Sequence, residues 1–242
     1  FDESSESSIQ TLGLRWHIDQ DVFKIQYRPS TQINKPLTNR SILSMVASIF
    51  DPLGLIAPVV VLCKMFIQKL WLSKLTWDEP IDSELTQIWL SISSNLPDIA
   101  HVTIPRLAKS MGLPIRVYLH VFADASNEAY GAAVYLIIFT EQSVSSHIVL
   151  SKSKVAPLKP LTIPRLELAA ALLAAKLSRK IHSIMNSSIL KTHLWSDSTI
   201  VLSWLKRQPR DFNIFVATRL AEIDELTHQH EWLHVPTKDY II

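Results

Sequence analysis

Two kinds of hydrophobic periodicity divide the first 110 residues. Short alternations of apolar and polar residues run from Leu12 to Tyr27 and are split by Asp19-Gln20-Asp21, which is typical of a two-stranded hairpin. The polar residues 1–8 before it are expected to be a mobile lead-in. Helical patterns follow: an apolar segment over Ser41–Phe50, a second helix with Val59, Cys63, Phe66, Ile67 and Leu70 on one face, and a third capped by Asp82.

The pattern changes after a stretch with three prolines, Pro97 to Pro114, where we place a domain boundary. Beyond it the order of elements is βββ-α-β-α-α-β, which predicts a mixed five-stranded sheet with helices on its faces. The predicted strands are Val117–Asp124, Tyr130–Phe139, His147–Lys152, Thr192–Trp195 and Trp232–Val235, and the predicted helices are Arg165–Met185, Ser198–Lys206 and Phe212–Leu226. The fold class is therefore α/β, with residues 1–110 and 111–242 as separate domains.

Composition removes several classes of site. Only 4 glycines are present and no GxGxxG or GK[ST] motif occurs, which argues against a glycine-rich phosphate loop. The single cysteine, Cys63, allows no disulfide framework and no cysteine-based zinc site. The longest apolar run, Leu53 to Cys63, is too short to span a bilayer, so no membrane partner is expected. A net charge of +2 does not by itself indicate a nucleic-acid-binding protein.

Three acids stand at the ends or beginnings of predicted elements. Asp124 closes a strand that is apolar on both faces, Glu167 lies in the first turn of the long helix, and Asp197 follows the next strand. Each has an ordinary explanation taken alone: a turn residue, a favourable charge at a helix N-terminus and an N-cap. A row of small residues, Ala170, Ala171 and Ala174, shares the helix face of Glu167 and would allow a close approach to the sheet.

Taken together, the three acids can meet at one edge of the sheet. Three carboxylates without a nearby base repel one another, and this raises their pKa values. Hard divalent cations such as Mg²⁺ prefer oxygen ligands and remove that penalty, and a pair of them can support hydrolysis of a phosphodiester. The spacing leaves two interpretations open: a metal centre made by Asp124, Glu167 and Asp197, or three unrelated caps.

At these residues the sequence resembles a known family. The segments FADAS, RLEL and WSDST, in this order, resemble the ribonuclease H domain of retroelement reverse transcriptases. More narrowly, the chain from about residue 11 to 240 resembles the polyprotein of BEL/Pao-type retrotransposons. The segments that carry this resemblance are RSILSMVASIFDPLGLIAPV, LTWDEP, SKVAPLK, TIPRLELAAALLA, LWSDSTIVLSWL and RLAEIDEL.

The resemblance implies a ribonuclease H-like fold for residues 111–242 and a reverse transcriptase thumb or connection region for residues 1–110. It implies hydrolysis of the RNA strand of RNA–DNA hybrids by an endonuclease that holds two Mg²⁺ (or Mn²⁺) ions, with Asp124, Glu167 and Asp197 as metal ligands and catalytic residues. The expected partners are the hybrid and the rest of the retroelement polyprotein, of which we expect this chain to be a fragment. An intracellular, cytoplasmic location is also implied.

One departure from the family pattern concerns a fourth acid. The family continues past the last strand with Asp-Asn-Pro-Ala-Asp, whereas this chain reads Pro236-Thr-Lys-Asp-Tyr-Ile-Ile, and Asp239 matches the first acid of that motif rather than the ligand. The resemblance therefore predicts a domain truncated at its C-terminus. The alternative function is a catalytically impaired retroelement remnant that binds nucleic acid or has a structural role.

Other residues carry weaker signals. Basic residues that could contact phosphates precede the Glu167 helix and follow the Asp197 helix: Lys152, Lys154, Arg165, Lys206 and Arg207. They are equally compatible with solvated loops. His228, His230 and His234 lack a zinc-site spacing, so we interpret them as a polar turn followed by the last strand. Ser126 has no histidine close by in sequence, so we interpret it as a turn residue. A peptidase label attached to this family is not supported, since no Asp-[ST]-Gly motif occurs.

Overall fold

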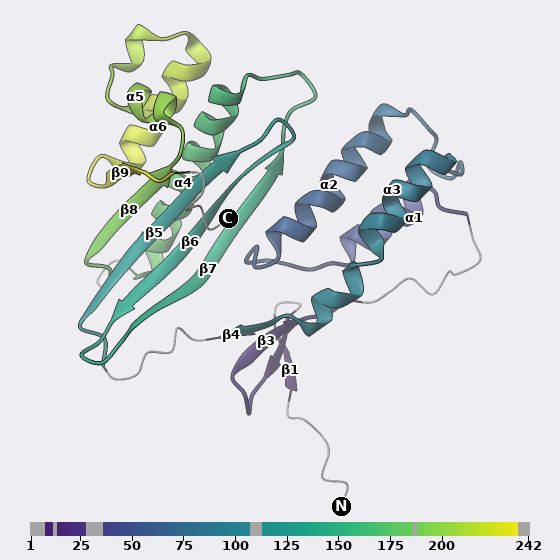
Figure 1. Ribbon diagram of the computed structural model, residues 1–242, viewed down its shortest axis with the longest axis horizontal. Coiled ribbons are helices and arrows are strands. Elements are labelled where there is room, and N and C mark those ends of the chain that lie inside the picture. Colours follow the sequence, from purple (N-terminus) through teal and green to yellow (C-terminus); the bar gives the residue numbers. More distant parts are fainter. Residues whose placement is uncertain (1–7, 12–13, 28–35, 107–112, 186–187, 237–242) are drawn as a thin grey trace, which may run out of the picture. The chain divides into compact units, whose positions relative to one another are not determined.

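The computed structural model describes residues 8–11, 14–27, 36–106, 113–185 and 188–236 (Figure 1). The chain divides into two compact units. The first comprises Phe1–Pro52 and Ile56–Leu107, and the second comprises Leu53–Leu55 and Ala108–Ile242. Residues 1–7 of the predicted mobile lead-in, residues 1–8, and Asp239 lie outside the described residues, whereas Ser8 is the first residue of a strand. Within the described ranges, no helix is both long and apolar enough to cross a bilayer.

The first unit contains an antiparallel sheet in the order β1-β2-β3-β4. Its strands are β1 (Ser8–Thr11), β2 (Leu14–His17), β3 (Val22–Ile25) and β4 (Thr103–Pro105). The predicted hairpin is present as β2 and β3, but it is the middle of a larger sheet. Neither β1 nor β4 was predicted, because a strand of three or four residues leaves almost no periodicity and β4 joins from far along the chain.

Three helices form the remainder of this unit: α1 (Asn39–Ala47), α2 (Ala57–Leu72) and α3 (Ser83–Ser93). A 3₁₀ helix, η1 (Leu96–His101), follows them. Asp82 caps α3 as predicted, since its carboxylate accepts the Leu85 N–H at 2.8 Å. Helix α1 begins two residues before the predicted start because Thr38 and Ser41 form a capping box, and it ends three residues before Phe50. The core of the unit includes the stacked rings of Phe66 and Trp89, with centroids 5.3 Å apart.

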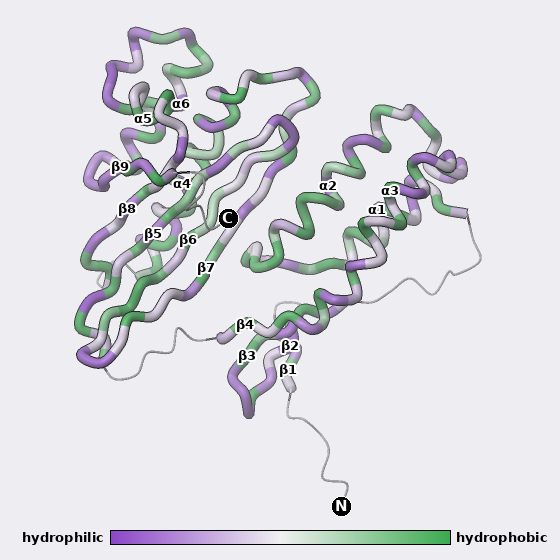
Figure 2. The backbone as a smooth tube through the Cα atoms, in the orientation of Figure 1, coloured by the Kyte–Doolittle hydropathy of each residue, from purple (hydrophilic) through white to green (hydrophobic). Residues whose placement is uncertain are grey.

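The second unit is built on a mixed sheet in the order β7-β6-β5-β8-β9. Its strands are β5 (Arg116–Ala125), β6 (Ala129–Phe139), β7 (Val144–Val155), β8 (Lys191–Ser196) and β9 (Glu231–His234). The predicted element order and the central position of β5 are confirmed. Hydrophobic stretches run along β5 and β6, which each lie between two paired strands of the sheet (Figure 2).

Helix α4 (Ile163–Met185) lies directly on one face of this sheet (Figure 1). Helix α5 (Thr199–Leu205) contacts β8 and β9, and helix α6 (Ile214–Thr227) packs against α4. A short 3₁₀ helix, η2 (Pro209–Asp211), precedes α6. Helix α4 has two buried faces. Ala170, Ala174 and Leu177 pack on the sheet, whereas Leu168, Ala171 and Ala175 pack against α5 and α6. The predicted small-residue row is therefore split, since Ala171 belongs to the helix–helix side.

Residues 53–55 form part of the second unit through contacts with the edge strand β7. The Leu53 carbonyl accepts the Ser151 N–H at 2.8 Å, and the Gly54 carbonyl accepts a hydrogen bond from the Ser151 hydroxyl. Gly54 has a φ of +70°, a conformation that side chains bearing a Cβ adopt at a cost. This segment satisfies backbone groups that the edge of the sheet would otherwise leave exposed.

A candidate metal centre

Asp124 occupies the penultimate position of the central strand. It is half-buried, it stands opposite Gly131 of β6, and the N–H of Ala125 donates to its Oδ1 at 2.7 Å. Burial is the largest cause that raises the pKa of Asp124, the hydrogen bond opposes this shift, and the charge of Asp197 adds to it. The strand therefore delivers a carboxylate whose charged form is disfavoured.

Glu167 reaches the same place from helix α4. The helix begins at Ile163, two residues before the predicted start, so Glu167 lies just beyond the first turn rather than within it. Its side chain is buried, with 6% of the residue exposed, and the fully buried Ala170 and Ala174 follow on its side of the helix. These small residues let the helix approach the sheet closely, which brings Glu167 to the end of β5.

Asp197 lies between strand β8 and helix α5. The sequence allowed it to be an N-cap, but the cap is Ser198, whose Oγ accepts the Val201 N–H at 3.3 Å. Strand β8 runs parallel to β5, with Ser196 level with Ala123. Asp197 consequently follows β8 at the same edge of the sheet at which Asp124 ends β5.

The three carboxylates converge. One oxygen from each of Asp124, Glu167 and Asp197 lies within 4.8 Å of the other two, and among the described residues this is the one group of three potential ligands so arranged. Burial, followed by the charges of Asp124 and Asp197, raises the pKa of Glu167 to about 8. The mutual repulsion expected from the sequence is therefore present in the folded chain.

The residues fit a divalent cation. The Oε2 atom of Glu167 is buried and accepts no hydrogen bond from the described residues. Neither Asp124 nor Glu167 forms an ion pair with a lysine or arginine in the ranges that the structure describes. A buried carboxylate without a base is costly. Oxygen ligands alone, with room for water, suit Mg²⁺ or Mn²⁺ rather than a softer metal.

The basic residues singled out from sequence differ in burial and in the element that carries them. Lys152 and Lys154 are exposed on β7 and flank Ser153, which pairs with Gly131 opposite Asp124, so they lie two strands from the acids. Lys206 and Arg207 are exposed at the end of α5. Arg165 is half-buried, and its guanidinium carbon lies 5.3 Å from the centre of the Phe215 ring.

Sequence reasoning missed a second arginine on the same ring. Arg219 of α6 places its guanidinium carbon 3.5 Å from the Phe215 centroid. Phe215 and Arg219 both lie in the predicted helix Phe212–Leu226, for which the sequence indicated no binding role. A phenylalanine followed four residues later by an arginine is the signal that could have drawn attention to them, because residues so spaced share a helix face.

The remaining candidates are explained by local structure. Ser126 is a turn residue, as predicted: its Oγ accepts the N–H groups of Glu128 and Ala129 between β5 and β6. His228 is the C-cap of α6, and His230 lies in the turn before β9. His234 is the last residue of strand β9, as expected for a polar turn followed by the last strand.

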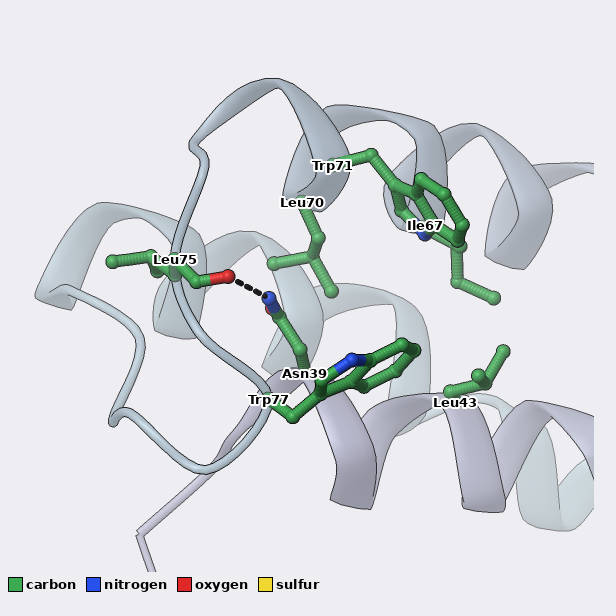
Figure 3. A pocket seen from close by; sticks show the side chains of 7 residues that line it. All are labelled: Asn39, Leu43, Ile67, Leu70, Trp71, Leu75 and Trp77. Atoms are coloured by element: carbon green, nitrogen blue, oxygen red, sulfur yellow. Dashed lines mark hydrogen bonds between the residues drawn. The ribbon is translucent and has the colours of Figure 1, made fainter.

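A pocket lies within the first unit, between α1, the end of α2 and the following loop (Figure 3). Its lining is mainly apolar and includes Leu43, Ile67, Trp71 and Trp77. Asn39 closes one side by donating from its amide to the Leu75 carbonyl at 3.1 Å. The volume of about 210 Å³ is smaller than is usual for small-molecule sites, so we assign no ligand to it.

Comparison with known families covers most of these elements. The sequence model of the family described as "Pao retrotransposon-like RNaseH-like domain" matches residues 38–198, a span that contains all three acids. The chain belongs to this family. Its ribonuclease H-like fold follows from the same match and from the sheet order described above. Comparison with curated protein sequences finds no match for this Pao-family chain.

Solved structures resemble it at low sequence identity. The foamy viral protease-reverse transcriptase, determined in complex with RNA/DNA hybrid, aligns with a TM-score of 0.50 and 12% identity over 97% of this chain and 30% of the viral one. The N-terminal RNase H domain of a Mycobacterium tuberculosis protein has a TM-score of 0.36 and 15% identity over 50% of this chain and 84% of its own. RNase H1 from Halobacterium salinarum has a TM-score of 0.32 and 17% identity, over 51% and 87% respectively.

Proposed function

We propose that the second unit of this Pao-family chain is a metal-dependent endonuclease that hydrolyses the RNA strand of RNA–DNA hybrids. The observation that carries the proposal is the convergence of Asp124, Glu167 and Asp197 within 4.8 Å at one edge of the sheet. Membership of a ribonuclease H-like retrotransposon family supports the substrate class. The foamy viral protease-reverse transcriptase was determined in complex with an RNA/DNA hybrid, and this suggests the substrate to test with the present chain.

In this proposal the three carboxylates hold two Mg²⁺ or Mn²⁺ ions. When bound, such ions activate water and stabilise the leaving oxygen of an in-line phosphoryl displacement. The residues themselves supply fixed oxygen ligands. Strand β5 positions Asp124, the backbone of Ala125 orients that carboxylate, and the tight packing of α4 fixes Glu167. Loss of the Glu167 proton on metal binding would link activity to pH, because burial holds its pKa at about 8.

We also propose that the first unit corresponds to the thumb or connection region of a reverse transcriptase polyprotein. The family model extends back to residue 38, through helices α1, α2 and α3, and the viral alignment covers 97% of the chain. The first unit would correspond to that region in sequence and fold, and we propose no catalytic role for it.

The test is cleavage of a hybrid labelled separately on its RNA and DNA strands, in Mg²⁺ or Mn²⁺. We expect cuts in RNA alone, none in EDTA, and none with Asp124→Asn. The matched control is Asp224→Asn, which removes one exposed carboxylate from α6 and should leave cleavage unchanged. Binding of the hybrid without cleavage by the unchanged chain would contradict the nuclease and favour a nucleic-acid-binding remnant.

A further inference from the structure

Two arginines from different helices share one aromatic ring close to the beginning of α4, the helix that also carries Glu167. Arg165 comes from the start of α4, and Arg219 comes from one turn inside α6. Their guanidinium carbons lie 5.3 Å and 3.5 Å from the centroid of Phe215. Arg219 is held further by a hydrogen bond from its Nη1 to the Phe215 carbonyl at 2.9 Å. All three residues are half-buried, so the ring limits the motion of the two arginines while part of each arginine stays accessible to solvent.

The charge of this pair is not neutralised within the described residues. Neither arginine forms an ion pair with a carboxylate there, although the same two helices are joined elsewhere by an ion pair between Lys176 and Glu222 at 2.7 Å. Two cations on one ring repel each other, and the attraction of each to the ring offsets only part of that cost. An anion with several oxygens would remove the repulsion. Stacking orients a guanidinium while leaving its N–H groups along the edge available to such an anion.

The location of Arg165 and Arg219 indicates which kind of anion they would bind. Arg165 precedes Glu167 by two residues on the same helix, about 3 Å along the axis and on the opposite side of it. A ligand held by Arg165 would therefore lie at the same end of α4 as Glu167, on the other side of the helix, and would not enter the acid cluster. The backbone of a nucleic-acid strand crossing the acids presents phosphates on either side of the reacting one. A phosphodiester is also the group that planar guanidinium donors bind through paired hydrogen bonds.

We propose that Arg165 and Arg219, seated on Phe215, form a clamp for one backbone phosphate of the strand that enters the acid cluster. The identity of that strand rests on the proposed nuclease function, but binding of a phosphate by the clamp does not require cleavage. The clamp positions the substrate and does not take part in the chemistry. It also explains why an arginine with no carboxylate partner among the described residues lies half-buried at the beginning of α4.

The experiment measures binding in the absence of cleavage. The full chain is titrated into a fluorescent RNA–DNA hybrid in EDTA at several KCl concentrations, and the slope of log K against log[KCl] is determined. Arg165→Gln and Arg219→Gln should each weaken binding about tenfold and reduce the steepness of the slope by about one, the signature of one lost phosphate contact. Lys180→Gln, on the exposed side of α4 some 22 Å further along the helix, removes the same charge and should change neither quantity.

Three results would overturn the clamp: no hybrid binding by the unchanged chain, unchanged affinity and slope in both glutamine variants, or an equal effect of Lys180→Gln. If a glutamine variant melts early, Arg165→Lys and Arg219→Lys replace it. These variants keep the charge and lose the planar fork, so they should weaken binding several-fold, and full affinity would contradict the proposal. If the chain binds hybrid through the clamp but cuts no RNA in Mg²⁺, the clamp proposal is supported and only the nuclease proposal is refuted.

Discussion

A carboxylate oxygen of Glu167 lies within 4.8 Å of one from Asp124, although helix α4 carries the first and strand β5 carries the second. Burial and the charge of Asp197 raise the pKa of both acids, and the charge of Asp124 raises the pKa of Glu167 further. The fold maintains this unfavourable proximity through well-packed elements on either side. Metal binding, pH dependence and packing around the cluster are therefore open to separate tests.

Divalent cations should stabilise the second unit. At a hundredfold excess over Kd, Mg²⁺ or Mn²⁺ is expected to add about 2.7 kcal/mol, equivalent to a rise in Tm of about 5–10 °C at pH 8. Asp124→Asn should abolish the rise, whereas Asp224→Asn, on the exposed side of α6, should retain it. The measurement is a thermal melt with and without metal. A rise that survives Asp124→Asn would place the ions elsewhere.

Glu167 should make the metal-free protein less stable as the pH rises. Its folded pKa of about 8 exceeds the ordinary value of 4.5, so the folded chain retains a proton that the unfolded chain has lost. Stability falls between these two values and levels off above pH 8. Glu167→Gln removes the charge, so at pH 9 its free energy of unfolding should exceed that of the unchanged chain by an amount on the order of 2 kcal/mol, measured as a higher Tm. At pH 4 the two chains should not differ in this way.

A parallel shift of the two melting curves at all pH values would show that the glutamine acts through packing rather than charge. Addition of Mg²⁺ supplies a second comparison. The ions should restore much of the lost stability of the unchanged chain at pH 9 and should do less for the Glu167→Gln variant, because one ligand has lost its charge. Equal restoration in both would exclude Glu167 from the ligand set.

The close approach of α4 to the sheet depends on small side chains. Ala174 is fully buried against the sheet, so Ala174→Leu should force the helix outward and cost about 1–3 kcal/mol. The matched control is Ala221→Leu, an exposed position on α6 that should leave the Tm nearly unchanged. Thermal melts compare the two. Equal Tm values would mean that the space between α4 and the sheet accommodates a larger residue.

Gly54 should be intolerant of a side chain. Its φ is +70°, and a Cβ there would collide with the backbone carbonyl of Ser151 on β7. Gly54→Ala is expected to cost about 2 kcal/mol or more, measured as a lower Tm. Gly131→Ala is the control, since a Cβ at that position makes ordinary contacts, the nearest at 3.4 Å with the Lys152 carbonyl. Similar losses in both variants would show that Gly54 has no special role.

Much of the second unit could be predicted from the sequence because its signals are local. The central strand was recognised from apolar residues on both faces, the long helix from its alanine and leucine spacing, and the three acids from their positions at element ends. The first unit was harder. Strands β1 and β4 are too short to show a period, and β4 exists only because residues distant in the chain complete a sheet edge.

The sequence by itself determined the order of the elements and the residue types available at one edge of the sheet, since hydrophobic period and capping act over a few residues. Only the tertiary structure decided which of those residues meet. It brought Glu167 onto the acids of two parallel strands, gave the cap of α5 to Ser198 and turned Ala171 away from the sheet. It also set Arg219 beside Arg165 on one ring, because helix packing joins residues 54 positions apart that no local pattern relates.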